Sequence, residues 1–224
     1  MAEERPLPFT DRADAGRALA QRLMERRFAD PIILALPRGG VPVAAEIARK
    51  LNAPLDLLLV RKIGVPYQRE LAVAAVLDGS QPQIVVDETI RERAGVDPSY
   101  IHDQAKIELS EIERRRTAYL RGRAPLPVQG KTAIVVDDGI ATGTTMRAAL
   151  KGLRRLGPAK IVLAVPVAPR ETIERLRAEA DEIICLAQPD PFGAIGYFYR
   201  DFHPLRDSEV VRALAEAAAI PPEN

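Results

Sequence analysis

The sequence predicts an α/β fold with a doubly wound, mostly parallel sheet, helices on both faces, a partly helical insertion and a small C-terminal hood. Short apolar runs of strand length alternate with longer segments of helical periodicity along most of the chain. Near the N-terminus, two such strands flank one amphipathic helix, an order typical of a βαβ unit in a parallel sheet. The alternation resumes in the second half of the chain, so we expect both halves to contribute to one sheet.

The first part of the chain predicts a helix and then the βαβ unit. The predicted elements are a helix over 11–29, a strand over 32–36, a helix over 42–51 and a strand over 55–60. Thr10 or Asp11 can cap the first helix, and Pro42 stands in the first turn of the second, where proline is favoured. A right-handed crossover between the two strands follows by default.

The middle of the chain interrupts this alternation. Residues 61–70 are polar, carry glycine and proline and show no periodicity, which predicts a mobile loop before the apolar run 71–77. A short strand and a long charged helix follow, over 84–86 and 98–123. We interpret about 81–129 as an insertion into the α/β domain.

The last part of the chain returns to strands and helices. The predicted elements are a strand over 133–136, a helix over 144–156, a strand over 161–165, a helix over 170–180, a strand over 183–186 and a final helix over 207–219. Before the final helix, residues 188–205 carry a cluster of aromatic side chains. Clustered aromatic rings at this point predict a hood over a flat ligand.

Composition excludes several classes of function. The 224 residues are 47% hydrophobic, enough for a single domain over 1–224 with its insertion. The 32 basic and 31 acidic residues give a net charge of +1, so no bulk field attracts nucleic acid or an acidic membrane. A single cysteine, Cys185, excludes an internal disulfide and fits a reducing compartment. No export signal or membrane-spanning run is recognisable, so we expect a cytoplasmic protein.

The most informative segment is 134–145, which reads Ile-Val-Val-Asp-Asp-Gly-Ile-Ala-Thr-Gly-Thr-Thr. It predicts a buried strand that ends in two acids, then a tight loop of small residues, then a helix. In an open parallel sheet the carboxyl ends of strands face the ligand crevice, so this acid pair, Asp137 and Asp138, should reach a ligand. Gly139 and Gly143 allow the backbone to approach that ligand closely.

This loop is suited to a sugar phosphate. The first amides of the following helix and the hydroxyls of Thr142, Thr144 and Thr145 form a phosphate cradle that needs no lysine. The carboxylates would repel that phosphate, so we expect their partner to be a diol or a hydrated metal ion. The simpler interpretation is a βα turn with an aspartate cap, as at Asp87, but it explains neither the paired acids nor the three threonines.

The segment resembles the fingerprint of the type I phosphoribosyltransferases, an apolar strand with two acids and a loop that ends in Thr-Gly-Gly/Thr-Thr/Ser. The resemblance implies that Asp137 and Asp138 hold the ribose 2- and 3-hydroxyls of 5-phosphoribosyl 1-pyrophosphate (PRPP). It also implies that the loop holds the 5-phosphate. The substrate-binding residues implied in this loop are Gly139, Ile140, Ala141, Thr142, Gly143, Thr144 and Thr145.

A second part of the resemblance is the turn Pro-Arg-Gly-Gly after the first predicted strand of the parallel sheet, where the family has its pyrophosphate loop. Arg38 supplies a fork of donors for phosphate oxygens, and Gly39 and Gly40 expose backbone amides at a helix start. Taken alone, this segment is only a turn. On the same sheet as the acid pair, it is expected to bind pyrophosphate.

A third part is Arg61-Lys62, which resembles the start of the flexible lid of this family. Closing such a lid would expel water and place cations near the departing pyrophosphate. The resemblance therefore implies that Arg61 binds substrate and that Lys62 takes part in catalysis. The alternative is an ordinary solvated strand end.

The acceptor base is expected to lie under the hood. Phe192 and Tyr197 offer aromatic faces there, although the same rings could instead seal the core or a dimer interface. Ala141 stands where the 6-oxopurine enzymes of the family carry an acid, and the strand end 164–167 lacks their base-reading lysine. A hypoxanthine or guanine substrate is therefore disfavoured. The order Asp-Asp-x-x-Ala-Thr-Gly is closer to that of the adenine enzymes, but the base stays undefined.

The reaction implied by the resemblance is transfer of the phosphoribosyl group from PRPP to a nitrogenous base, with release of pyrophosphate. Its transition state would be oxocarbenium-like, with Arg38, Lys62 and loop amides stabilising the leaving group. The two histidines, His102 and His203, lie far apart without a metal-ligand pattern. Mg²⁺ is therefore expected to arrive with PRPP and to meet the acid pair directly or through water.

Two other functions stay open on the same residues. One is a regulatory protein that senses PRPP without catalysis, although neither a DNA-binding domain nor a basic RNA-binding face is recognisable. The other is binding of a different sugar phosphate, which fold analogy does not exclude. A receiver domain is disfavoured, because its acid pair should follow the first strand. We expect no nucleic-acid partner, and the long helix of the insertion could supply the interface of a homodimer.

Overall fold

The computed structural model describes residues 7–79 and 82–218. Its helices are α1 (Arg12–Met24), α2 (Gly40–Leu51), α3 (Glu88–Arg93), α4 (Pro98–Leu120), α5 (Thr144–Arg155), α6 (Arg170–Leu176) and α7 (Asp207–Ala218), with a 3-10 turn η1 (Ile195–Phe198). Its strands are β1 (Pro31–Ala35), β2 (Leu55–Leu57), β3 (Val60–Val65), β4 (Gln68–Leu77), β5 (Gln83–Val86), β6 (Thr132–Val136), β7 (Lys160–Val167) and β8 (Glu182–Ala187). None of these helices is long and apolar enough to cross a membrane. Ala219, the last residue of the predicted C-terminal helix, lies outside the described residues.

The principal sheet confirms the predicted fold class. Five strands run parallel in the order β2-β1-β6-β7-β8. β1 lies between β2 and β6, with Ile33 opposite both Leu55 and Ile134. The strand order reverses between β1 and β6, because the chain leaves β1 toward one edge of the sheet and β6 toward the other. Such a switch point opens a crevice at the carboxyl ends of the two strands.

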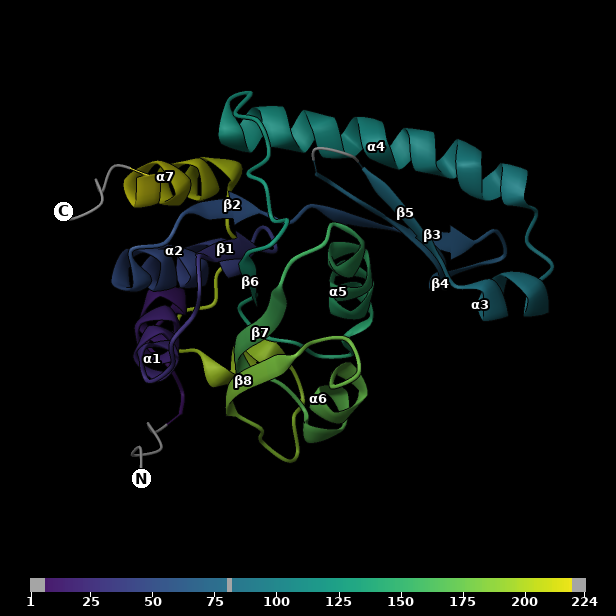
Figure 1. Ribbon diagram of the computed structural model, residues 1–224. Helices are drawn as coiled ribbons and strands as arrows, with labels where there is room; N and C mark the ends of the chain where they lie inside the picture. Colours follow the sequence, from purple (N-terminus) through teal and green to yellow (C-terminus); the bar gives the residue numbers. More distant parts are fainter. Residues whose placement is uncertain (1–6, 80–81, 219–224) are drawn as a thin grey trace.

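Helices cover both faces of this sheet, as Figure 1 shows. On one face, Ile33 and Ile134 pack in a core with α1 and α2, and α7 lies against α2. On the other face, Leu34 and Val135 pack in a core with α5 and α6. Successive strand residues point to opposite faces, so strands buried on both sides need nearly continuous apolar runs. This requirement explains why the strands of the parallel sheet were recognisable in the sequence.

The prediction of a mobile loop over 61–70 is wrong, because this segment belongs to a second sheet. β3, β4 and β5 form an antiparallel sheet in the order β3-β4-β5, and a short turn at 66–67 joins β3 to β4. The register between β3 and β4 shifts on both sides of Gly64. Such bulges disrupt the alternation of polar and apolar residues, which hides the strands in the sequence. The second sheet begins at Val60, earlier in the chain than the expected start of the insertion.

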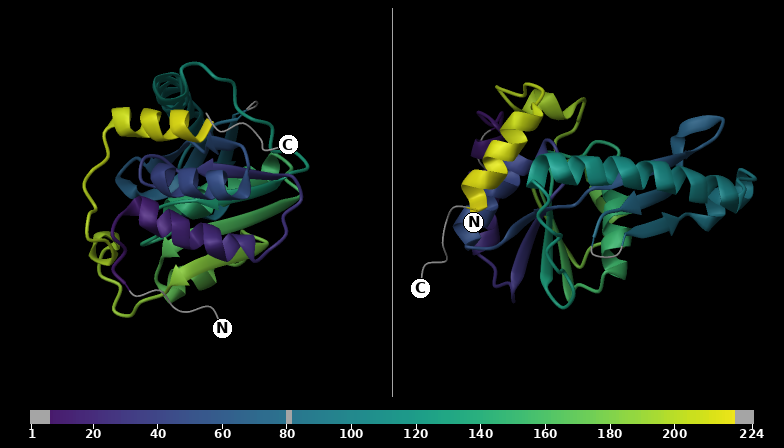
Figure 2. Two further views of the ribbon diagram at one scale, coloured as in Figure 1. Left: turned by 90° about the vertical axis from the view of Figure 1, so that its left-hand side faces the viewer. Right: turned by 90° about the horizontal axis from the view of Figure 1, so that it is seen from above.

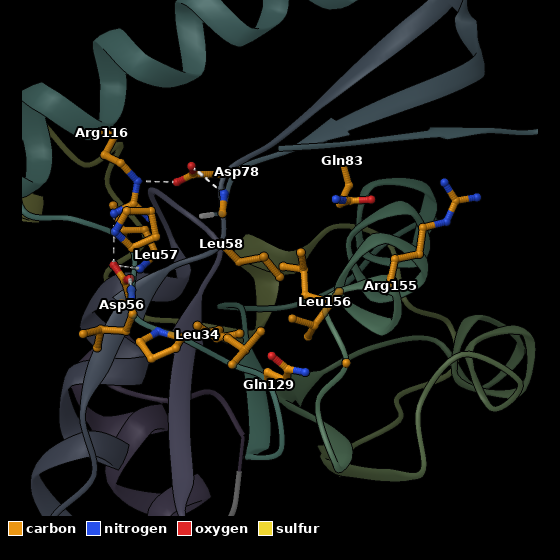
Figure 3. Close-up of a pocket in the computed structure, with 17 residues that line it drawn as sticks. Leu34, Asp56, Leu57, Leu58, Asp78, Gln83, Arg116, Gln129, Arg155 and Leu156 are labelled. Atoms are coloured by element: carbon orange, nitrogen blue, oxygen red, sulfur yellow. Dashed lines mark hydrogen bonds and ion pairs between the residues drawn. The ribbon is translucent and has the colours of Figure 1, made fainter. Parts of the chain in front are cut away.

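β3, β4, β5, α3 and α4 form an arm, called the extension below, that projects from the principal sheet (Figure 2). α4 lies along its sheet with Ile101 and Ile112 buried. Arg116 of α4 holds the base of the extension to the principal sheet, because it pairs with Asp56 of β2 and with Asp78 after β4 (Figure 3). These three charged side chains are almost fully buried and border a cavity of about 340 Å³.

Candidate functional site

The acid loop, residues 137–143, connects β6 to α5 at the switch point of the principal sheet. β6 is buried along its length and delivers Asp137 and Asp138 at its carboxyl end. Gly143 has φ of +77°, a left-handed conformation that favours glycine, and α5 begins at Thr144. The first amides of α5 have no acceptors within the helix, so they are available to an anion in front of it.

The acid loop is in direct contact with the turn after β1. A methyl group added to Gly39 would lie 2.1 Å from a carboxylate oxygen of Asp138. A methyl group added to Gly40 would lie 2.6 Å from the carbonyl oxygen of Val136 and 2.9 Å from Cα of Asp137. The structure therefore brings the two predicted binding loops together, because they follow the neighbouring strands β1 and β6 and because glycine leaves room for the approach.

Asp138 is turned toward the interior, where it pairs with Arg12 of α1. Arg12 Nε donates to Asp138 Oδ2 at 2.7 Å, and both side chains are about nine-tenths buried. Arg12 also lies over the ring of Phe202, 4.0 Å from its centroid, and the Tyr199 hydroxyl donates to the Asp138 carbonyl. The sequence placed both acids at the ligand, whereas the structure engages Asp138 with Arg12 and leaves Asp137 half-buried at the crevice.

Burial raises the pKa of both acids. For Asp137 the main cause is loss of solvation, and the nearby charge of Asp138 raises the pKa further. For Asp138 loss of solvation is again the main cause, and the hydrogen bond from Arg12 opposes it. The Asp138 amide donates to Asp137 Oδ1 at 2.9 Å, which ties the two residues to one loop geometry. Carboxyl groups with perturbed pKa values at a crevice are typical of functional sites.

The threonine-rich rim of the acid loop is open to solvent. The exposed residues there are Ala141, Thr142, Thr144 and Thr145. The backbone beneath them is held in place, because the Ile140 amide donates to the Val167 carbonyl at 3.0 Å and the Thr172 hydroxyl donates to the Ala141 carbonyl at 2.8 Å. The rim can therefore present amides and hydroxyls to a phosphoryl group with little rearrangement.

Arg38 precedes Gly39 in the turn after β1 and is accessible. Its side chain is half exposed, and its guanidinium lies 3.6 Å from the Asp207 carboxylate at the start of α7. The Tyr119 hydroxyl of α4 donates to the same carboxylate oxygen at 2.9 Å. The peptide bond between Pro37 and Arg38 is cis. Asp207 of α7 thus holds Arg38 in place, and Tyr119 of α4 holds Asp207, while half of the Arg38 side chain stays accessible to a ligand.

Arg61 and Lys62 are in different surroundings. Arg61 Nε donates to Glu108 of α4 at 2.6 Å, and its side chain lines a hollow of about 40 Å³ together with Pro37 and Thr145. Lys62 is the next residue of β3, so its side chain points to the opposite face of the strand and does not line this hollow. The structure brings Arg61 to the two binding loops and does not bring Lys62 there.

Phe192 and Tyr197 of the hood differ in how far their rings are exposed. The Phe192 ring centroid lies 5.1 Å from that of Phe198, within an aromatic cluster between the hood and the N-terminal segment. Tyr197 is 77% exposed, so its ring is accessible. Ile195 of η1 lies against Gly139 of the acid loop. The hood therefore borders the site, with Tyr197 as its accessible ring.

Arg12, Tyr199 and Asp207 contact site residues, although no sequence pattern predicted them. Arg12 and Asp138 are 126 positions apart, so no local motif could join them. Within the described residues, no three His, Cys, Asp or Glu side chains are arranged to hold a metal ion. A metal ion at this site would need most of its ligands from substrate and water.

The strand order, its reversal between β1 and β6, and the acid loop at that point define an α/β protein of the type I phosphoribosyltransferase fold. The chain matches the family described as "Phosphoribosyl transferase domain" over residues 10–202. It therefore belongs to the phosphoribosyl transferase family.

Relatives of the chain agree with this assignment. "Putative phosphoribosyl transferase Rv0571c" of Mycobacterium tuberculosis is 45% identical over 219 residues, which are 95% of this chain and 49% of that protein. The chain thus spans about half the length of this curated relative. "Bifunctional protein PyrR" of Microcystis aeruginosa is 31% identical over 175 residues, 73% of this chain and 89% of the relative. The crystal structure of TT1426 from Thermus thermophilus has a TM-score of 0.84 and 40% identity, and covers 94% of this chain and 99% of that one.

Proposed function

We propose that the protein transfers the 5-phosphoribosyl group from PRPP to a nitrogenous base and releases pyrophosphate. The proposal depends on one observation, the contact between the acid loop and the turn after β1, where Gly39 lies against Asp138. One loop offers acids and a phosphate cradle, and the other offers Arg38 and Gly39, whereas the Gly40 amide, which the sequence predicted to be exposed, donates to the Leu36 carbonyl at 3.0 Å. The two loops meet at the switch point, where open α/β sheets bind their ligands. Membership of the family supports the class of reaction.

Asp137 is the acid proposed to hold the ribose hydroxyls most directly. A carboxylate has about four acceptor positions, and the bond from the Asp138 amide uses one of them. Asp138 is proposed to contribute Oδ1, the carboxylate oxygen that Arg12 does not engage. It is also proposed to hold the acid loop in its conformation. The amides that open α5 and the exposed threonines would hold the 5-phosphate, because a helix N-terminus favours an anion.

Mg²⁺ is proposed to enter the site with PRPP. The acid pair provides oxygen atoms, which Mg²⁺ prefers, but too few for a complete coordination shell. When bound, the ion would neutralise charge that develops on the pyrophosphate. Arg38 is proposed to bind and orient the same leaving group through its fork of donors. Lys62 would need a movement of the β3–β4 hairpin to take part in catalysis.

The acceptor base is proposed to lie between the acid loop and the hood. The accessible ring of Tyr197 suits stacking on a flat heterocycle. Ala141 provides no proton acceptor at the exposed rim, which disfavours a 6-oxopurine. The nucleophile is then a ring nitrogen of another base.

Two measurements test the proposal. Calorimetric titration with PRPP and Mg²⁺ tests binding, and a screen of purine and pyrimidine bases for pyrophosphate release tests transfer. The Asp137→Asn variant keeps the shape of the side chain and removes its charge, and we expect it to bind PRPP about tenfold more weakly or worse. If PRPP binds but no base causes release of pyrophosphate, the protein would sense PRPP and would not transfer its phosphoribosyl group. Binding of a different sugar phosphate in place of PRPP would contradict the substrate itself.

A further inference from the structure

We propose that Arg115 of α4 binds the pyrophosphate group of PRPP, so that the extension completes the substrate site. This inference rests on the proposed function, since it assigns a further residue to the same site. Its starting point is the hollow that Arg61 lines, which we call the junction hollow.

The junction hollow lies where the principal sheet, α5 and the extension meet. Pro37 reaches it from the turn after β1, Thr145 from the first turn of α5, Arg61 from β3, and Ile112 and Arg115 from α4. Its volume of about 40 Å³ admits about three water-sized groups, which matches the oxygens of one phosphoryl group and excludes a base. Its other lining residues, Leu36, Leu58, Leu59 and Val60, are apolar, so Thr145, Arg61 and Arg115 supply its polar side chains.

Two arginines, Arg61 and Arg115, line this hollow and keep unused hydrogen-bond donors. Arg61 Nε donates to Glu108 at 2.6 Å, and Arg115 Nε donates to Glu111 at 2.7 Å. Over the described part of the chain, the terminal nitrogens of these two arginines make no hydrogen bond. Each side chain is about one-third exposed, so its free donors can reach an incoming anion. A guanidinium fixed at Nε by a carboxylate presents the rest of its fork in a defined direction.

Arg38 is a third cation close in the chain to the junction hollow, although it does not line it. The guanidinium of Arg38 lies 3.6 Å from the Asp207 carboxylate oxygen that accepts from Tyr119, and Tyr119 stands one turn after Arg115 on α4. Arg38 follows Pro37 in the chain, and Pro37 lines the hollow. Two guanidinium groups on the hollow, with Arg38 next to its lining residue Pro37, suit the pyrophosphate, the most highly charged part of PRPP. The 5-phosphate has its own cradle in the acid loop.

Arg115 is positioned by the residue that follows it. Arg116 is buried between Asp56 and Asp78, which fixes the rotation and register of α4 at this point. Consecutive residues of a helix point about 100° apart. Because Arg116 is anchored toward the cavity at the base of the extension, Arg115 is directed to the neighbouring side, where the hollow lies. The buried ion pairs of the extension thereby preorganise a binding residue.

Arg114 provides a matched control for Arg115. Both arginines donate to Glu111 through Nε at 2.7 Å, but only Arg115 lines the junction hollow. Replacing either one with alanine removes one of the two arginines from Glu111 and leaves the other bonded to it, so Glu111 stays paired in both variants. The melting temperatures of Arg114→Ala and Arg115→Ala should be alike, which separates binding from folding.

The test is calorimetric titration of the wild-type protein and both variants with PRPP and Mg²⁺, with inorganic pyrophosphate and Mg²⁺, and with ribose 5-phosphate. We expect Arg115→Ala to bind PRPP and pyrophosphate about tenfold more weakly, because one charged hydrogen-bond donor is lost. Its affinity for ribose 5-phosphate should not change. Arg114→Ala should match the wild-type protein with all three ligands, and Arg115→Lys should recover part of the loss.

Equal pyrophosphate affinity of Arg115→Ala and the wild-type protein would overturn the inference. So would a loss confined to ribose 5-phosphate, because the hollow would then belong to the 5-phosphate. Failure of the proposed function would give a different result. The wild-type protein would then bind pyrophosphate but not PRPP. In that case the comparison of Arg115→Ala with Arg114→Ala still decides the role of Arg115. A wild-type protein that binds neither ligand would overturn both proposals.

Discussion

Arg12 Nε of α1 lies 2.7 Å from Asp138 Oδ2 of the acid loop, across 126 positions of the chain, and both side chains are about nine-tenths buried. The helix α1 thus contacts the acid pair through the ion pair between Arg12 and Asp138. Half of the pair already has a charged partner before any ligand arrives. This relationship makes α1 part of the site and leads to the first prediction.

Replacing Arg12 with methionine should destabilise the protein on the order of 3 kcal/mol, because Asp138 would be left as a buried carboxylate without its ion pair. The free energy of unfolding in urea measures this loss. Arg22→Met on the same helix breaks an exposed pair with Glu25 and should change stability little. The double variant Arg12→Met/Asp138→Asn should recover part of the loss, and failure to do so would show that Arg12 acts through packing alone.

Asp137→Asn should stabilise the protein at pH 7 while it weakens PRPP binding. The pKa of Asp137 is raised by burial, so folding favours its protonated form. The stability contributed by such a group is fully present below its unfolded pKa of about 4 and is lost as the pH rises through the higher folded pKa. At pH 7 the wild-type protein therefore carries the cost of a partly desolvated carboxylate that asparagine avoids.

Urea unfolding of the wild-type protein and Asp137→Asn over a pH series checks this sign. The stability difference should be largest near neutral pH and should shrink as the pH falls toward the unfolded pKa. A difference that does not depend on pH would contradict the prediction.

Thr172→Val should weaken PRPP binding through loss of its hydrogen bond to the Ala141 carbonyl, which is 2.8 Å long. Thr132→Val is a matched control, because the Thr132 hydroxyl donates to the Ala29 carbonyl at the same distance, away from the site. Thr132→Val should cost about 1 kcal/mol in stability, and Thr172→Val somewhat more, because the Thr172 hydroxyl also accepts from Arg175 at 3.0 Å. Only Thr172→Val should raise the dissociation constant for PRPP, and an equal effect of both would mean that the acid loop does not depend on this bond.

Arg116→Met should destabilise the protein on the order of 3 kcal/mol, because Asp56 and Asp78 would lose the guanidinium between them. It should also weaken pyrophosphate binding, because α4 would no longer direct Arg115 toward the junction hollow. Lys106→Met, which removes an exposed pair with Asp103 on the same helix, should leave both quantities nearly unchanged. Unfolding curves and calorimetric titration measure the two effects.

The parts of the fold that were recognisable in the sequence are those set by local patterns. The strands of the parallel sheet are buried on both faces and therefore read as short apolar runs. The acids, glycines and threonines lie within the short segment 137–145, so the chemistry of the acid loop was visible without the fold. The β3–β4 hairpin was missed because the register shifts around Gly64 remove the alternation by which a strand is recognised.

The sequence by itself determined the parallel α/β sheet and the two loops that meet at its switch point, because strand burial and loop chemistry are encoded in neighbouring residues. Only the tertiary structure decided which charges lie together. It paired Asp138 with Arg12 and placed Arg115 beside Pro37 and Thr145. It also directed Arg61 into the junction hollow and Lys62 to the opposite face of the same strand. Electrostatic interactions act through space, so residues far apart in the chain become partners only once packing has brought their elements into contact.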